Sequence, residues 1–147
     1  MDALQHFFIR PFFLSLTIGI PFCIYKFLFG LSALRTGSQG LALLGLVVVG
    51  WAGADLLMNA GRSIYDLAGR TAPFEYCTIA QIGRAFRRPA VFLAIDTLLT
   101  FVAISLMLWS GWIGRLLPIE TALWNGATTL NLISLSLVSL YNEMRKV

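Results

Sequence analysis

Four stretches of mainly apolar residues, each about as long as a bilayer-spanning helix, constrain this chain more than any other feature. They cover residues 12–34, 41–60, 89–112 and 121–141. A helix needs about 20 residues to cross the hydrocarbon core, because each residue adds about 1.5 Å. The pattern predicts an all-α membrane protein in which residues 1–147 form a single transmembrane domain. The four transmembrane helices would be arranged as two hairpins.

The scarcity of charge excludes the main alternative, a soluble helical domain. Only 12% of the 147 residues are charged and 58% are hydrophobic, whereas about a quarter of the residues in a soluble domain are charged. Four such helices would lack the polar faces that water requires. The net charge of +4 comes from basic residues beside the apolar stretches. We interpret it as a topology and lipid-headgroup signal, and we expect no nucleic-acid partner.

The distribution of basic residues predicts the orientation of the helices, because cytoplasmic loops are enriched in Lys and Arg. With Lys26 set aside as intramembrane, eight basic residues lie on the side of the termini and central loop, against two, Arg35 and Arg115, on the other. We therefore expect both termini to be cytoplasmic, in a bacterial plasma (inner) membrane or an equivalent energy-transducing membrane. The eight are Arg10, Arg62, Arg70, Arg84, Arg87, Arg88, Arg145 and Lys146.

The second stretch carries Asp55, a carboxylate that is costly in lipid unless it is paired, solvated or protonated. Helical spacing places it on a stripe of four residues that should face protein rather than lipid: Trp51, Asp55, Asn59 and Arg62. In the first stretch, Lys26 is expected to extend its stem to the nearer interface, as long basic side chains do.

Asp96, in the third stretch, is predicted to lie at the same depth as Asp55. Asp55 precedes Arg62 by seven residues and Asp96 follows Pro89 by seven, so each lies about 10 Å from the cytoplasmic boundary. Two carboxylates that face each other there would bind a cation or relay a proton. The structural alternative is that each bonds separately to hydroxyls, amides or interfacial arginines. The candidate intramembrane polar network comprises Asp55, Asn59, Asp96, Thr100 and Asn131.

Small residues in the second stretch and basic residues after it indicate two contact surfaces. Gly50, Gly53 and Ala54 would let another helix approach closely. Residues 74–88 of the central loop have a mild helical pattern and are expected to lie in the membrane interface, although an ordinary connecting loop fits nearly as well. Four arginines are candidates for contact with lipid headgroups or an acidic partner surface: Arg62, Arg84, Arg87 and Arg88.

Short sequence patterns recur in the two predicted hairpins. An F-x-R-P pattern opens each one, at residues 8–11 and 86–89, and a Ser-x-Tyr pattern closes each one. A parallel duplication would explain both and would make Asn131 the counterpart of Asp55. The alternative is that membrane helices begin with Arg-Pro and end with Tyr for interfacial reasons.

The sequence contains no recognisable catalytic set. Its single histidine, His6, rules out bis-histidine haem ligation within the chain, and Cys23 and Cys77 lack metal-ligand spacing. There is no HExxH motif, phosphate-binding glycine loop or serine–base–acid set. We therefore expect no enzymatic activity and assign no metal or cofactor.

The function favoured by these features is that of a small, non-catalytic, structural subunit of a larger integral-membrane complex. It would pack helices, hold lipid or a cofactor between them, and aid assembly. Its expected partners are the lipid bilayer and other membrane-protein subunits or further copies of itself. The alternative is a small oligomeric ion or proton transporter or channel that uses Asp55 and Asp96.

Overall fold

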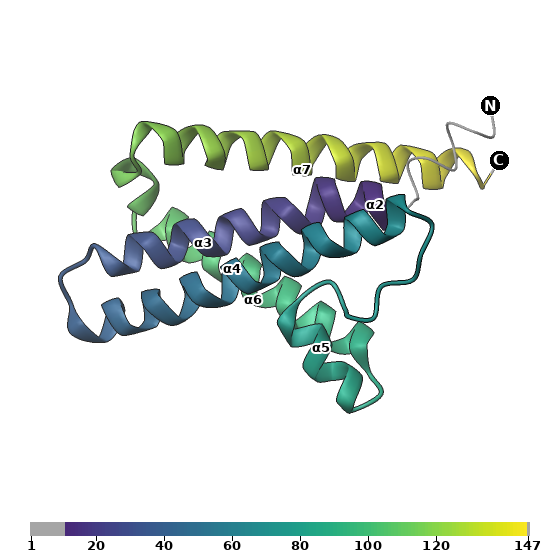
Figure 1. The fold of residues 1–147 in the computed structure, drawn as a ribbon. Coiled ribbons are helices and arrows are strands. Elements are labelled where there is room, and N and C mark those ends of the chain that lie inside the picture. The colour runs from purple at the N-terminus through teal and green to yellow at the C-terminus, as the bar shows by residue number, and fades with distance from the viewer. Residues whose placement is uncertain (1–10, 147) are drawn as a thin grey trace.

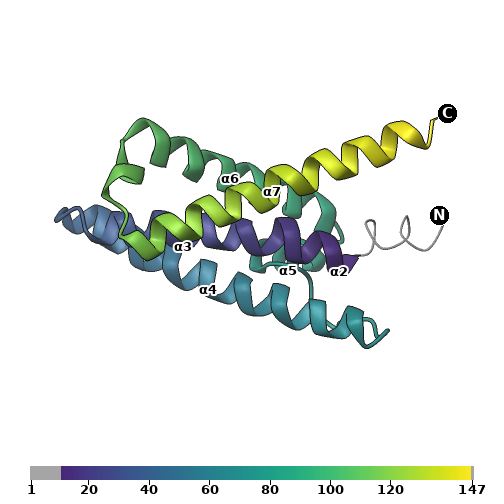
Figure 2. The ribbon, with the colours of Figure 1, turned by 90° about the horizontal axis from the view of Figure 1, so that it is seen from above.

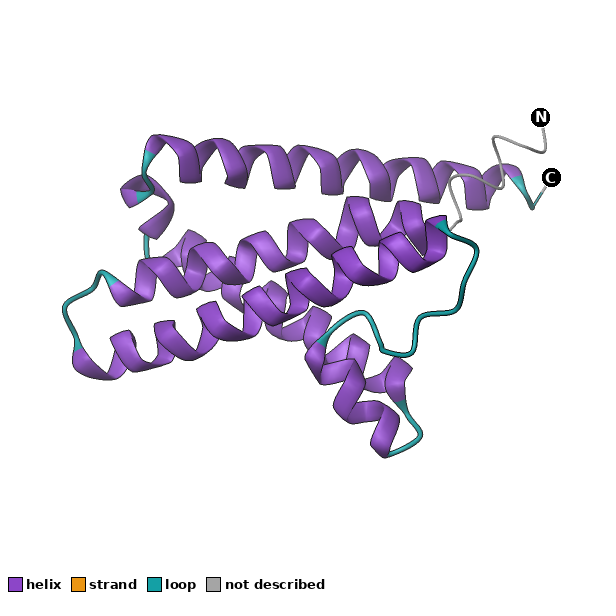
Figure 3. Cartoon of the chain, viewed as in Figure 1, coloured by secondary structure: helices purple, strands orange, loops and turns teal. Residues whose placement is uncertain are grey.

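A computed structural model describes residues 11–146, and all of their regular structure is helical (Figures 1 and 3). The predicted all-α class is therefore confirmed. His6 and Arg10 lie outside the described residues. In chain order the elements are α2 (Pro11–Leu14), the π-helical turn η1 (Ser15–Gly19), α3 (Ile20–Leu34), α4 (Gln39–Leu67), α5 (Thr78–Ala85), α6 (Pro89–Trp109), the 3-10 turn η2 (Trp112–Arg115) and α7 (Pro118–Met144).

Three helical segments are long and apolar enough to cross a membrane. They are Phe12–Leu34, which joins α2, η1 and α3, then Gln39–Leu67 and Pro89–Trp109. These segments indicate an integral membrane protein in contact with the lipid bilayer. α7 is long enough, with 27 residues, but its amide and hydroxyl groups lower its mean hydropathy. It is therefore not among the described helices that are apolar enough to cross a membrane.

Proline shapes the first long helix. Pro21 has no backbone N–H with which to bond the carbonyl of Thr17, and the π-helical turn Ser15–Gly19 immediately precedes α3. Ser15 and Thr17 of this turn are both buried. The Thr17 hydroxyl lies 2.7 Å from that of Ser134 on α7, so the irregular turn places hydroxyl groups between helices.

α3 is the central helix, and α4, α6 and α7 each pack against it with few direct contacts among themselves (Figures 1 and 2). Of the most apolar 18-residue segment, half is buried in Phe12–Leu34, which contains α3, whereas 22% is buried in α4 and in α6. The second apolar stretch is therefore an outer helix. The core combines residues of all four helices: Phe22, Tyr25, Leu28, Phe29, Val48, Ala103, Met107, Trp124 and Ala127.

Two glycines allow α3 and α4 to approach closely. A Cβ atom at Gly45 would lie 2.6 Å from the carbonyl oxygen of Gly30, and backbone cannot move aside as a flexible side chain can. A Cβ atom at Gly50 or Gly53 would instead point into open space, with no neighbouring helix or side chain of the described chain within 4 Å. Among the described residues, another face of α4 is turned towards α3, and the predicted packing of a helix against Gly50, Gly53 and Ala54 remains a prediction.

The α3–α4 turn and the α6–α7 connection lie at one end of the molecule, and the start of α2 and the end of α7 lie at the other (Figures 1 and 2). At the first end, Arg35 Nη1 donates a 2.8 Å hydrogen bond to Glu120 Oε2. Glu120 also accepts from the Leu117 N–H at 2.9 Å, at the start of α7. The ion pair between Arg35 and Glu120 therefore joins the two connections.

Candidate functional site

The charged side chains of three long helices meet at one buried point. Lys26 of α3, Asp55 of α4 and Asp96 of α6 are 1%, 0% and 4% exposed. Lys26 Nζ donates to Asp55 Oδ2, and to the two carboxylate oxygens of Asp96 at 3.0 and 3.2 Å. An ammonium group has three N–H donors, so these three contacts engage all of the donors of Lys26. We call Lys26, Asp55 and Asp96 the ion cluster.

The expectation that Lys26 extends to a membrane interface is wrong. Side chains on a helix incline towards its N-terminus, and on α3 this direction runs past Trp51 of α4 towards Asp55. Lys26 Nζ lies 4.5 Å from the centre of the Trp51 ring, where the indole face attracts a cation. Withdrawing the lysine would leave buried carboxylates unpaired, at a cost of about 3–5 kcal/mol.

Asp55 also anchors the loop that follows α4. Its Oδ1 accepts hydrogen bonds from the Thr78 N–H at 2.7 Å and from the Thr78 hydroxyl at 2.8 Å. Thr78 begins α5, so the carboxylate also faces the positive end of a helix dipole. Segment 74–88, expected as an interfacial helix, is α-helical over Thr78–Ala85, and the start of that helix is held against the ion cluster.

Asp96 has a different environment from Asp55. Both of its carboxylate oxygens accept from Lys26, and its side chain lines a cavity. Thr100 is buried one turn further along α6, but its hydroxyl donates to the backbone carbonyl of Asp96 at 2.9 Å. The Cys77 side chain also hydrogen-bonds to the Asp96 carboxylate. Because an ionised carboxylate accepts about four hydrogen bonds, Asp96 retains capacity for about one more at the cavity wall.

A second set of polar contacts lies one helical turn from Asp55. The side-chain amide of Asn59 accepts from the Ser15 hydroxyl and donates to the Tyr76 carbonyl, both at 2.9 Å. Ser63 donates to the Ser15 hydroxyl at 3.0 Å. A Cβ atom at Gly19 would collide with Asn59, so glycine allows this contact. The hydroxyl of the π-helical turn thereby joins the first helix to α4.

Asn131 stands apart from the ion cluster. It is buried on α7, and its Oδ1 has no hydrogen-bond partner within the described chain. Its neighbour one turn on, Ser134, bonds to Thr17. The structure thus joins Asp55 and Asp96 through Lys26. Asn59 belongs to the neighbouring set of polar contacts, Thr100 bonds to the backbone of Asp96, and Asn131 lies outside both sets.

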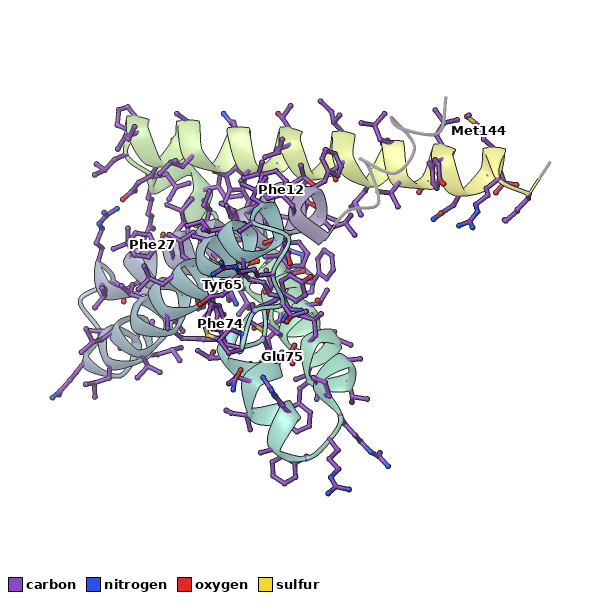
Figure 4. All side chains as sticks on the ribbon, turned by 45° about the vertical axis from the view of Figure 1, so that its right-hand side comes forward. Phe12, Phe27, Tyr65, Phe74, Glu75 and Met144 are labelled. Atoms are coloured by element: carbon purple, nitrogen blue, oxygen red, sulfur yellow. The ribbon has the colours of Figure 1, made fainter. Side chains whose placement is uncertain are left out.

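Arg62 is taken up by the loop after α4. Its Nη1 donates to the Phe74 carbonyl at 2.8 Å and lies 3.3 Å from Glu75 Oε2, and its guanidinium stacks 3.9 Å from the centre of the Tyr76 ring. Tyr65 packs edge-on against Phe74, and Figure 4 shows these two side chains close to Glu75. Arg62 therefore fastens the loop to α4 and is only partly accessible.

The other three candidate arginines are exposed near the end of α5. Arg84 donates to the Pro73 carbonyl at 2.6 Å, whereas Arg87 and Arg88 follow the helix and are exposed. Arg87 has a φ of 57°, in the left-handed region that costs most residues about 1–2 kcal/mol. Their predicted contact with headgroups or a partner remains a prediction.

A cavity of about 310 Å³ lies between the first long helix and α6. Its wall is mainly apolar, and its polar end adjoins the ion cluster. Burial raises the pKa of the Cys77 thiol to about 11, so this thiol is neutral near pH 7 and is not a nucleophilic thiolate. The lining includes Leu14, Ile18, Phe22, Leu93, Thr97, Cys23, Lys26, Asn59, Cys77 and Asp96.

The chemistry of the site is that of ionic and hydrogen-bonding groups. Within residues 11–146, no group of three or more His, Cys, Asp or Glu side chains is placed to hold a metal ion. The cavity is at the lower limit of the volumes typical of small-molecule sites. The site can therefore hold helices together, accept a proton or cation, or bind a small, mainly apolar molecule.

Sequence reasoning missed the roles of Lys26 and Thr78. A charge count contains a signal for Lys26, since two carboxylates and one ammonium lie within the apolar stretches. No comparable signal marks Thr78, because its contact with Asp55 depends on the path of the loop.

No family model, curated protein or solved structure matches this chain. Its function is therefore inferred from the geometry of the helices, the ion cluster and the cavity.

Proposed function

We propose that this chain is a small, non-catalytic subunit of a larger integral-membrane assembly, in which α7 contacts a partner helix. The first long helix, α4, α6 and α7 would span the membrane as two hairpins, with both termini cytoplasmic. The 27 residues of α7 would extend about 40 Å, which exceeds the hydrocarbon thickness. The shared position of the α3–α4 and α6–α7 connections (Figure 1) and the excess of basic residues in the other connections also support this arrangement.

The observation that carries the proposal is a polar stripe on the exposed side of α7. Its residues are separated by four, seven and three positions, a spacing that places them on one side of a helix. All four are exposed, whereas Trp124 and Ser134 on another side of α7 are buried. Amide and hydroxyl groups are poorly suited to lipid tails and can hydrogen-bond across helices. We call these residues the α7 stripe: Asn125, Thr129, Ser136 and Ser139.

The second half of α7 extends the argument. The buried residues of this helix end at Ser134, and Figure 2 shows the following turns leaving the other helices. A partner helix that packs along α7 would cover Ser136 and Ser139. The ion cluster fits the same role, because it ties α3, α4 and α6 into a stable platform from which α7 is presented.

The experiment compares two variants in cells that produce the full chain. Asn125→Leu/Thr129→Val removes polar groups from the α7 stripe, and Thr97→Val removes a hydroxyl from α6 that bonds to its own helix, at the Leu93 carbonyl. After mild detergent extraction, native mass spectrometry should show the unmodified chain and Thr97→Val in a complex of fixed stoichiometry. The stripe variant should be released as a folded monomer with unchanged helical circular dichroism. Retention of the complex by the stripe variant would contradict the proposal.

The cavity beside Asp96 favours a second function, the transport of protons or cations by an oligomer of this chain. With all three groups ionised, the ion cluster has two negative charges and one positive charge, so uptake of one positive charge would neutralise it. Buried ionisable groups in membrane proteins often mark such pathways. The purified chain would then move ions in liposomes without another protein, and Asp96→Asn would abolish the flux at unchanged protein level. If the chain is a subunit, Asp55→Asn should mainly lower its abundance.

A further inference from the structure

We propose that the cavity between the first long helix and α6 binds an apolar amine whose ammonium group donates a hydrogen bond to Asp96. The proposal concerns the ligand class of the cavity and does not depend on the partner of α7. It rests on the charge balance of the ion cluster, the free acceptor capacity of Asp96 and the apolar lining of the remaining wall.

The charge balance favours a cation. All three N–H donors of Lys26 are engaged by carboxylate oxygens, so an anionic ligand would find no free donor on it. Asp55 already accepts from Lys26 and twice from Thr78. Asp96 is the carboxylate that lines the cavity, and it accepts from Lys26 alone among the ammonium and guanidinium groups described. An added ammonium would also neutralise the excess negative charge of the cluster.

The rest of the wall fits the apolar body of the ligand. Leu14, Ile18, Phe22 and Leu93 line the apolar part of the cavity. Leu93 is 37% exposed, so the cavity reaches the outer surface of α6 that lipid would cover. A cavity of about 310 Å³ accepts a phenyl ring with a short alkyl chain. Such a ligand would enter from the membrane with its charged end directed towards Asp96.

Three probes of one shape separate the possible ligand classes: phenylbutylamine, phenylbutanol and phenylbutyrate. Their binding to the full chain in phosphatidylcholine nanodiscs would be measured by equilibrium dialysis, with the uptake of protein-free discs subtracted. We expect saturable binding of the amine, about tenfold tighter than that of the alcohol, because the ion pair and its charge-assisted hydrogen bond are lost in the alcohol. The carboxylate should bind most weakly.

Two variants and one control connect the binding to this cavity. Asp96→Asn should weaken amine binding about tenfold and leave the binding of the alcohol unchanged. Glu143→Gln makes the same charge change at an exposed position on α7 and should alter neither. Leu93→Trp adds bulk at the wall without changing charge, so it tests the site even if Asp96→Asn does not fold, and it should weaken both probes.

Several outcomes would overturn the proposal. Equal affinity for amine and alcohol would identify a site for neutral apolar molecules, such as lipid tails. Tighter binding of phenylbutyrate would mean that Lys26 recognises an anion. The absence of saturable binding, or amine binding that is unaffected by Leu93→Trp, would show that the cavity is not an amine site.

Discussion

Thr78 donates both its backbone N–H and its hydroxyl to Oδ1 of Asp55, at 2.7 and 2.8 Å. The other oxygen of Asp55 accepts from Lys26. Thr78, at the start of α5, thus supplies the hydrogen bonds to the carboxylate oxygen of Asp55 that Lys26 does not contact. The loop between α4 and α6 is therefore attached to a buried charge as well as to the side chain of Arg62.

Replacing Thr78 by valine should destabilise the protein, because the shape is kept while one donor to a buried carboxylate is lost. We expect the free energy of unfolding to fall by about 1–3 kcal/mol, measured by denaturation in detergent. The control is Thr97→Val, whose hydroxyl bonds within its own helix and should change the stability little. Equal losses in the two variants would mean that the Thr78–Asp55 contact has no special weight.

Removing the cation of the ion cluster should be more harmful than removing the whole cluster. Lys26→Met leaves two buried carboxylates without their partner, and we expect a loss of about 3–5 kcal/mol. Adding Asp55→Asn and Asp96→Asn to the same chain removes that uncompensated charge and should recover most of the stability. The three chains would be compared by their unfolding midpoints in the same detergent. A triple variant as unstable as Lys26→Met would show that Lys26 acts mainly through packing.

Replacement by alanine should have different effects on stability at Gly45 and at Gly50 of α4. Gly45→Ala places a methyl group against the backbone of Gly30 and should cost about 1–3 kcal/mol. Gly50 has open space, so Gly50→Ala should be neutral or stabilise the helix by up to about 1 kcal/mol. Thermal unfolding of the isolated chain tests both. If Gly50→Ala lowers the stability only in a native complex, a partner helix packs against this position.

The Cys77 thiol should react slowly at neutral pH. Burial raises its pKa from 9.0 to about 11, so in a Cys23→Ser background its alkylation by iodoacetamide should rise about tenfold per pH unit up to about pH 11. The folded pKa lies above the unfolded one, so the protonated thiol favours the folded state below pH 9 and this contribution is lost as the pH rises towards 11. An inflection of the alkylation rate near pH 9 would contradict this environment.

The positions of the long helices and the grouping of Asp55 with Asn59 on one side of α4 were accessible from sequence. Hydrophobic length marks the segments, and helical spacing places Asp55 and Asn59 on one side. The helical rise also places Asp55 and Asp96 at a common depth, and in the structure both bind Lys26. These inferences depend only on positions along single helices, which is why they needed no knowledge of the packing.

The choice of contacts between helices was not accessible in the same way. Gly50 and Gly45 lie in the same apolar stretch, and the rotation of α4 about its axis decides which of them meets α3. Lys26 has a stem long enough to reach an interface or a neighbouring helix, and the direction of its side chain together with the position of Trp51 selects the interior.

The amino-acid sequence alone therefore determined the helical class, the apolar segments and the presence of charges that need partners within the membrane. Hydrophobicity and helical periodicity are local properties, so they can be read along the chain. Only the tertiary structure decided that α3 is the central helix, that Lys26 joins Asp55 to Asp96, and that a cavity adjoins them. Those features depend on the rotation and relative position of helices from distant segments, which packing and charge pairing fix together.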